Sequence, residues 1–286
     1  MSVYHITLAS MASLIWGATF LFTDAALQHM PPLLFAALRF CFVLPVAFVV
    51  PRPNIPYWII ALAGIFLGVG QYGFQFLGMA QGVTPGLASL LAHTQAFFTI
   101  AIAALLFREQ IGAGQLAGIA LGIIGFAVLV FEKDNSTNVS ILFISILGAV
   151  SGAVGNNILK SIGGSVDILG VVVWMSIFVP IPLFLCSVAV DGWPTIQGAL
   201  ININLITILS LIYSAVFATI IAFVIWGKLL TLYPASVVAP FFLLVPVFGI
   251  FLSIALKNEP FGMARVVGCG FIFAGLIVSI VPRHSR

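Results

Sequence analysis

The chain contains the stretch EQIGAGQLAGIALGIIGFAV at residues 109–128 and a related stretch, EPFGMARVVGCGFIFAGLIV, at residues 259–278. One glutamate and three glycines keep the same register in both stretches, 150 residues apart. The matched pairs are Glu109 and Glu259, Gly112 and Gly262, Gly118 and Gly268, and Gly125 and Gly275. Four matched positions next to or inside long apolar runs indicate a duplicated unit. If each copy crosses a membrane an odd number of times, the two copies must lie in opposite orientations.

The composition points to a membrane protein. Of the 286 residues 62% are hydrophobic and only 6% are charged, and the mean hydropathy is +1.27. Soluble domains carry about 25% charged residues. The net charge of +3, without a basic run, argues against a nucleic-acid partner. The three cysteines, Cys41, Cys186 and Cys269, each lie in an apolar segment and predict neither a disulfide framework nor a metal site, so no cofactor is expected.

The apolar segments predict the architecture. A membrane-spanning helix needs about 20 mostly apolar residues. Ten segments meet this requirement: 7–26, 32–50, 57–80, 84–106, 112–131, 139–160, 167–190, 204–230, 235–256 and 261–281. They lack the period-2 alternation of a barrel strand, and no Lys or Arg precedes the first one, which is therefore expected to be a retained helix and not a signal peptide. The predicted fold class is an all-α membrane protein with ten transmembrane helices in two inverted five-helix repeats.

A polar run at residues 132–138 separates the two sets of five segments and predicts repeats over residues 1–137 and 138–286. Six basic residues flank the segments on the side of the termini, against three or four on the other side. By the positive-inside rule both termini are then cytoplasmic. The sequence predicts a multi-pass protein of the inner (plasma) membrane.

Arg39 is a charged residue about 10 Å into its segment. A charge at such depth is costly and usually faces a partner or an aqueous cavity. Two interpretations remain open. Arg39 could form a structural ion pair with Asp24 or extend its head group to the interface, or it could bind a substrate carboxylate through its planar fork.

Polar side chains also interrupt segments 3 and 4. Gln71 and Gln75 share one helix face, and segment 4 carries His93 and Gln95. Amides at bilayer depth need partners or water, so these helices are expected to line one cavity. His93 could contact substrate or take part in a proton-linked step, or it could remain neutral and donate one interhelical hydrogen bond.

Further substrate-binding candidates come from both halves of the chain: Trp16, Asn156, Tyr213 and Trp226. Aromatic rings beside a few polar groups are typical of small-molecule sites, although Trp and Tyr also gather at membrane interfaces. Segment 9 carries Pro240 and Pro246, whereas segment 4 has only Pro85 in its first turn. This asymmetry predicts a bend or hinge in segment 9.

The repeated glycines have a different expected role. Gly114, Gly118 and Gly122 form a small-residue stripe on segment 5, and Ala264 and Gly268 begin the equivalent stripe on segment 10. Such stripes allow close backbone contact, so we expect helix packing or a subunit interface there. Glu109 and Glu259 are expected to cap the helices that follow them.

Several short motifs resemble the EamA family of the drug/metabolite transporter superfamily, which includes bacterial exporters of amino-acid metabolites. They are Trp16-Gly17, Met30-Pro31-Pro32-Leu33, Leu38-Arg39-Phe40, Gly86-Leu87-Ala88-Ser89, Gln95-Ala96-Phe97-Phe98-Thr99, Ala117-Gly118-Ile119-Ala120-Leu121, Gly155-Asn156 with Lys160, and Leu244-Val245-Pro246-Val247 followed by Glu259. The resemblance implies ten helices in two inverted repeats, a central cavity bounded by helices 1, 3, 4, 6, 8 and 9, and export of small metabolites.

The leading hypothesis is a secondary transporter that exports small amino acids or related metabolites by alternating access. A broad-specificity transporter of drugs, metabolites or lipid-like solutes is the alternative. An intramembrane enzyme would need a catalytic set such as HExxH or GxSxG, and the sequence contains neither. The expected partners are a small-molecule substrate and membrane lipid, without nucleic acid, and the chain is expected to be a monomer or a weak homodimer.

Overall fold

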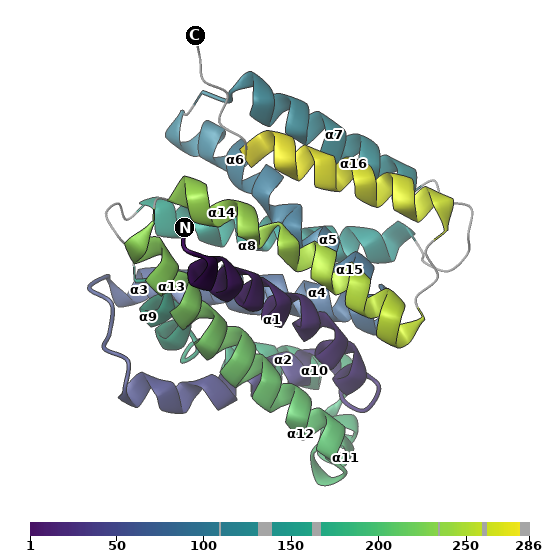
Figure 1. Cartoon of the computed structure of the whole chain (residues 1–286). Coiled ribbons are helices and arrows are strands. Elements are labelled where there is room, and N and C mark those ends of the chain that lie inside the picture. Colours follow the sequence, from purple (N-terminus) through teal and green to yellow (C-terminus); the bar gives the residue numbers. More distant parts are fainter. Residues whose placement is uncertain (109, 131–138, 162–166, 234, 259–261, 281–286) are drawn as a thin grey trace.

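The computed structural model of the chain describes residues 1–108, 110–130, 139–161, 167–233, 235–258 and 262–280. Within these ranges all regular structure is helical and no strand occurs (Figure 1). The predicted capping residues Glu109 and Glu259 lie outside the described residues. The all-α prediction is therefore confirmed for the part of the chain that can be described.

The first half contains nine helical elements. They are α1 (Val3–Leu27), α2 (Pro32–Val43), the 3₁₀ helix η1 (Leu44–Phe48), α3 (Tyr57–Ala63), the π-helix η2 (Gly64–Gly70), α4 (Gln71–Ala80), α5 (Pro85–His93), α6 (Gln95–Phe107) and α7 (Ala113–Val130). The second half has α8 (Val139–Ser161), α9 (Ile168–Met175), α10 (Pro180–Asp191), α11 (Trp193–Ile201), α12 (Leu205–Ile212), the π-helix η3 (Tyr213–Ile221), α13 (Ala222–Leu232), α14 (Ala235–Phe242), α15 (Leu244–Lys257) and α16 (Met263–Ile280).

Length and composition allow six helices among the described residues to cross a membrane. They are Val3–Leu27, Tyr57–Ala80, Pro85–Phe107, Val139–Ser161, Leu205–Leu232 and Pro240–Lys257. A seventh crossing exists if α9 and α10, which are bent by 46° at their junction, act as one span. Three shorter apolar helices cover Pro32–Phe48, Ala113–Leu129 and Met263–Ser279. The chain thus has the helices of a multi-pass membrane protein, and the larger number of ten spans stays a prediction.

Helix boundaries in the two halves recur at the same 150-residue offset as the sequence pattern. α7 covers residues 113–130 and α16 covers residues 263–280. Arg108 and Asn258 end the preceding helices with φ of 54° and 50°, and they are the non-glycine residues with positive φ in the described part of the chain. The π-helices η2 and η3 also fall at corresponding places. The duplicated pattern therefore has a counterpart in the backbone.

The repeated glycines bring α7 and α16 into contact, and the two helices lie side by side at one edge of the molecule (Figure 1). A Cβ atom added at Gly118 would lie 2.5 Å from the carbonyl oxygen of Gly275, and one added at Gly125 would lie 2.5 Å from that of Gly268. Gly118 thus faces Gly275, the repeat equivalent of Gly125, and Gly125 faces Gly268, the repeat equivalent of Gly118. This reciprocal contact is the pattern that a two-fold axis produces. The expectation that these glycines serve helix packing is confirmed.

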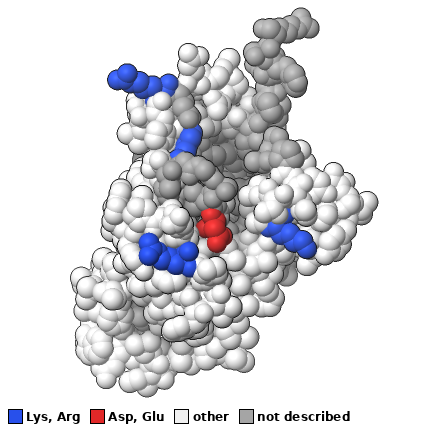
Figure 2. Space-filling model, turned by 90° about the vertical axis from the view of Figure 1, so that its left-hand side faces the viewer, with Lys and Arg blue, Asp and Glu red and all other residues white. Residues whose placement is uncertain are grey.

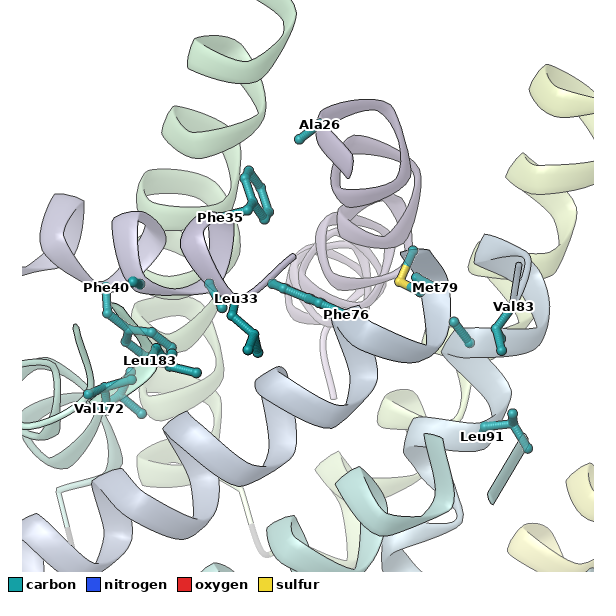
Figure 3. Close-up of a cluster of buried hydrophobic side chains, with 14 of the residues drawn as sticks. Ala26, Leu33, Phe35, Phe40, Phe76, Met79, Val83, Leu91, Val172 and Leu183 are labelled. Atoms are coloured by element: carbon teal, nitrogen blue, oxygen red, sulfur yellow. The ribbon is translucent and has the colours of Figure 1, made fainter. Parts of the chain in front are cut away.

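The largest apolar cluster joins α2, α4, α9 and α10. Figure 3 shows Phe40 of α2, Val172 of α9 and Leu183 of α10 meeting at one end of this cluster, with Phe76 of α4 farther along. All four side chains are buried. Because lipid is as apolar as leucine, such contacts hold helices together through close packing. This packing fixes the positions of α2 and α4, which carry the polar groups described below.

The surface of the protein is largely apolar, as expected for contact with lipid. In Figure 2 only scattered Lys, Arg, Asp and Glu side chains interrupt an otherwise uncharged surface among the residues that the structure describes. Large apolar side chains such as Leu105 of α6, Ile123 of α7 and Leu185 of α10 are exposed. A water-soluble monomer would not present so much apolar area.

Segments 4 and 9 are both divided into two helices. α14 ends at Phe242 and α15 begins at Leu244, so the predicted interruption of segment 9 is present. Segment 4 is interrupted at Thr94, between α5 and α6, although it has no internal proline. Each of the two segments thus has an interruption, and the hinge expected in segment 9 stays a prediction. The Thr94 hydroxyl donates a 2.6 Å hydrogen bond to the Leu91 carbonyl, a local alternative to the helix ladder that needs no proline.

Candidate functional site

Arg39 of α2 is buried in the protein interior, with 3% of its surface exposed. Its Nη2 donates to the hydroxyl of Tyr72 on α4 at 3.4 Å and to Oγ1 of Thr219 on η3 at 3.3 Å. The Tyr72 ring lies 4.3 Å from the guanidinium carbon. Nε and Nη1 have no hydrogen-bond partner among the described residues. Burial excludes the interpretation that Arg39 extends to the membrane interface.

Asp24 is not the partner of Arg39, because its carboxylate pairs with Nζ of Lys257 at 2.7 Å. This ion pair joins the ends of α1 and α15 beside a pocket of about 300 Å³. The pocket is lined by Asp24, Gln28, Met79, Ala80, Gly82, Val83, Thr84, Pro85, Ser253 and Lys257. The predicted Arg39–Asp24 ion pair is therefore wrong, since the Asp24 carboxylate pairs with a lysine of α15.

We expect the Asp24–Lys257 pair to add little to stability. The Lys257 side chain is 40% exposed and that of Asp24 is 17% exposed, and pairs this open to solvent contribute about 0–1 kcal/mol. A double-mutant cycle of Asp24→Asn and Lys257→Gln, read by thermal unfolding in detergent, should give a coupling energy below about 1 kcal/mol. A coupling above about 2 kcal/mol would contradict this assignment.

Two glutamines from different helices meet over Gly152 of α8. A Cβ atom added at Gly152 would collide with Oε1 of Gln95 from α6 and would lie 2.6 Å from Oε1 of Gln71 from α4. Both side chains are half-buried, and neither has a side-chain hydrogen bond to a described residue. Gln75 lies one turn beyond Gln71 and is buried. The structure thus brings Gln71 of segment 3 and Gln95 of segment 4 together, and the cavity expected between these segments stays a prediction.

Three aromatic rings from two helices surround Trp16 of α1. Phe223 and Trp226 of α13 and Phe242 of α14 each have a ring centroid 5.3 Å from that of Trp16. The indole Nε1 of Trp16 donates to the carbonyl oxygen of Ala218 on η3 at 2.8 Å. The structure therefore places the predicted Trp16 and Trp226 together. Phe223 and Phe242 were not predicted, because apolar residues do not stand out in an apolar chain.

Tyr213 begins η3 and contacts α1. Its hydroxyl donates to the carbonyl oxygen of Ile15 at 2.9 Å, and its ring stacks on that of Phe22 with centroids 3.9 Å apart. These contacts tie η3 to α1 over the two turns that precede and follow Trp16. The predicted residues Trp16 and Tyr213 therefore share one helix interface.

His93 ends α5 beside this aromatic group. Its ring centroid lies 4.9 Å from that of Phe242, and Nδ1 is 2.6 Å from the carbonyl oxygen of Ser89. A carbonyl can only accept, so Nδ1 carries the hydrogen and Nε2 presents a lone pair. Nε2 has no partner among the described residues. The one assigned hydrogen bond stays within α5, so the predicted interhelical bond is not the one that His93 makes.

The remaining candidates lie apart from this group. Asn156 of α8 is exposed, whereas its neighbour Asn157 is buried and donates to the carbonyl oxygens of Thr99 and Ala153 at 3.2 and 2.9 Å. Pro240 lies inside α14 and is exposed, and Pro246 lies in the first turn of α15 and is buried. In the described part of the chain no group of three His, Cys, Asp or Glu side chains could hold a metal ion.

Sequence reasoning did not connect Tyr72 and Thr219 with Arg39. Thr219 reaches Arg39 because η3 is a π-helix, in which the Thr219 hydroxyl donates to the Ser214 carbonyl five residues earlier at 2.8 Å. Regular 3.6-residue periodicity does not anticipate such a turn. Tyr72 follows Gln71 directly, and only its position in space shows that it covers the guanidinium.

Comparison with known proteins places this bundle of apolar helices among membrane transporters. The model of the EamA-like transporter family matches residues 4–131 and again residues 139–281. The chain therefore belongs to the EamA-like transporter family.

Two similar proteins carry a more specific description. A Salmonella typhimurium protein described as a probable amino-acid metabolite efflux pump is 38% identical over 98% of this chain and 95% of its own length. An Escherichia coli K12 protein of the same description is 37% identical over the same shares of both chains. A solved crystal structure with 19% identity superposes with a TM-score of 0.62, covering 97% of this chain and 96% of the other, and supports the fold.

Proposed function

We propose that this protein is a secondary transporter that exports small amino acids or related metabolites across the inner membrane by alternating access. The description of the Salmonella and Escherichia coli relatives supports this class of substrate. The observation that carries the proposal is the pair of amides over Gly152, contributed by α4 and α6. Amides at this depth without a protein partner are suited to polar groups of a solute.

The proposed topology has ten spans in two inverted halves, residues 1–137 and 138–286, with both termini in the cytoplasm. Each of the ten predicted apolar segments contains a described helix, and boundaries recur 150 residues apart. The two-fold contact between α7 and α16 agrees with halves of opposite orientation. These features support the topology. A protein of this kind needs lipid around it and no cofactor, and we expect a monomer or a weak homodimer.

In the proposed mechanism the two halves rock around a polar interior. Trp16, His93, Tyr213 and Trp226 border this interior from one side, and Gln71 and Gln95 border it from the other. Gln75 lies one turn beyond Gln71 on α4, and Asn156 lies one turn beyond Gly152 on α8. The breaks at Thr94 and Leu243, the latter between Pro240 and Pro246, are suited to act as hinges because backbone hydrogen bonding is already interrupted there. Each half contributes one such break.

Efflux from proteoliposomes tests the proposal. Vesicles with the purified protein and a mixture of radiolabelled amino acids inside should release a subset of them faster than protein-free vesicles, and the rate should saturate with internal concentration. Saturation separates a transporter from a channel. Release of none of the amino acids, together with movement of hydrophobic drugs or of fluorescent lipid, would overturn amino-acid export in favour of another solute class.

A further inference from the structure

Arg39 carries a positive charge that no described residue balances. Its neighbours Tyr72, Thr219 and Phe40 are uncharged, and the carboxylate of Asp24 is paired with Lys257. A buried charge without a partner is among the costliest groups a protein can hold. A buried, unpaired charge in the interior of a transporter therefore indicates a functional residue.

The hydrogen bonds of Arg39 are weak for a guanidinium. Both lengths, 3.4 Å to Tyr72 and 3.3 Å to Thr219, exceed the 2.7–2.9 Å of charge-assisted bonds. Two further guanidinium nitrogens, Nε and Nη1, have no partner among the described residues. The guanidinium is thus positioned by the protein and left without strong acceptors.

Helix α12 and η3 also carry two buried hydroxyl groups. Ser210 and Ser214 are four residues apart, both are buried, and the Oγ of each has no partner among the described residues. Helix α12 and η3 pack against α2, which carries Arg39. The Thr219 hydroxyl donates its hydrogen to the Ser214 carbonyl, so its oxygen accepts the hydrogen bond from Arg39. Ser214 therefore remains available to donate to a bound group.

We infer that Arg39 is the receptor for a small, singly charged anionic group, with Ser214 as second donor and Tyr72 as a cover that moves aside. A carboxylate of the exported solute and a free chloride ion share the required chemistry. One negative charge suffices, because Arg39 is the one cation at this site among the described residues. The carboxylate source rests on the proposed function, whereas the chloride source does not.

Ligand-dependent thermal unfolding of the purified protein in Tris–sulfate buffer tests this inference. The probes are L-serine, L-serinamide, which lacks the carboxylate, and sodium chloride. L-Serine or chloride should raise the unfolding temperature, since binding to the folded state stabilises it, and L-serinamide should not. In Arg39→Gln the apparent Kd obtained from the rise in unfolding temperature should be about 30-fold higher or more. Arg52→Gln is the matched control, because Arg52 is exposed, and its contacts with described residues are a hydrogen bond to the loop carbonyl of Ile55 and stacking on Tyr57.

The outcomes separate the two sources. A rise in unfolding temperature with L-serine alone assigns the site to a carboxylate, and a rise with chloride alone assigns it to an inorganic anion. Either result, or a rise with both probes, supports the inference. No response in the unaltered protein, or an unchanged response in Arg39→Gln, overturns it. If Arg39→Gln fails to fold, Arg39→Lys replaces it, since it keeps the charge without the planar fork and should bind about tenfold more weakly.

Failure of this inference is distinct from failure of the proposed function. Amino-acid efflux by the unaltered protein, together with an unfolding response to L-serine or chloride that Arg39→Gln leaves unchanged, removes the anion site and leaves the exporter. Anion binding at Arg39 in a protein that exports no amino acid removes the exporter and leaves the anion site.

Discussion

Replacing Gly118 by valine is expected to destabilise the protein by about 3 kcal/mol or more. A Cβ at this position meets the Gly275 carbonyl oxygen at 2.5 Å and the Ser279 backbone nitrogen at 3.0 Å. Backbone atoms cannot rotate away, so α7 and α16 must separate. The higher helix propensity of valine relative to glycine offsets less than about 1 kcal/mol of this destabilisation. The fraction of detergent-purified protein that stays monodisperse after heating measures the effect.

Gly270→Val is the matched control for this prediction. Gly270 also lies on α16, is exposed, and has nothing within 4 Å of an added Cβ. We expect its unfolding temperature to stay close to that of the unaltered protein. Equal loss of stability in Gly118→Val and Gly270→Val would show that helical glycines matter here for a reason other than the α7–α16 contact.

Gly152→Val is expected to reduce amino-acid efflux about tenfold or more while the protein stays folded. The added side chain displaces the ends of Gln71 and Gln95, which are flexible and can move without shifting a helix. Loss of one well-placed hydrogen bond costs about 1.4 kcal/mol, which is tenfold in affinity. Proteoliposome efflux and thermal unfolding of the same preparation measure the two quantities separately.

Gly148→Val, one turn earlier on α8, provides the contrast. An added Cβ there meets the Gln71 carbonyl oxygen at 2.9 Å and the Gln75 nitrogen at 3.3 Å, both backbone atoms. This variant should lose stability, whereas Gly152→Val should lose transport. Normal efflux by Gly152→Val would remove the two glutamines from the transport path.

The positions of the helices could be predicted from the sequence because apolar length and turn residues determine them. Segment 5, predicted at 112–131, is α7 at 113–130. Segment 7 was predicted as one span, but α9 ends at Met175 and α10 starts at Pro180 with a bend of 46°. Pro180 lacks an amide hydrogen and its ring crowds the carbonyl four residues earlier, at Ser176, which explains the break.

The arrangement of the polar groups was less predictable. The sequence identified Arg39, Gln71, Gln95 and His93 because polar residues stand out in apolar helices. It misassigned Asp24, because similar depth in the membrane does not fix the direction in which a helix presents a side chain. The contacts of Thr219 depend on a π-helix, whose extra residue per turn leaves no mark on the hydrophobic pattern.

The exchanged glycine contacts of α7 and α16 limit how related sequences can diverge. Gly118 touches Gly275 and Gly125 touches Gly268, so each position is constrained by a residue from the other copy of the duplication. A larger side chain at one of them requires compensating loss of volume on the facing helix. Among descendants of the ancestral duplication, these four positions should vary in concert while neighbouring lipid-facing positions drift independently.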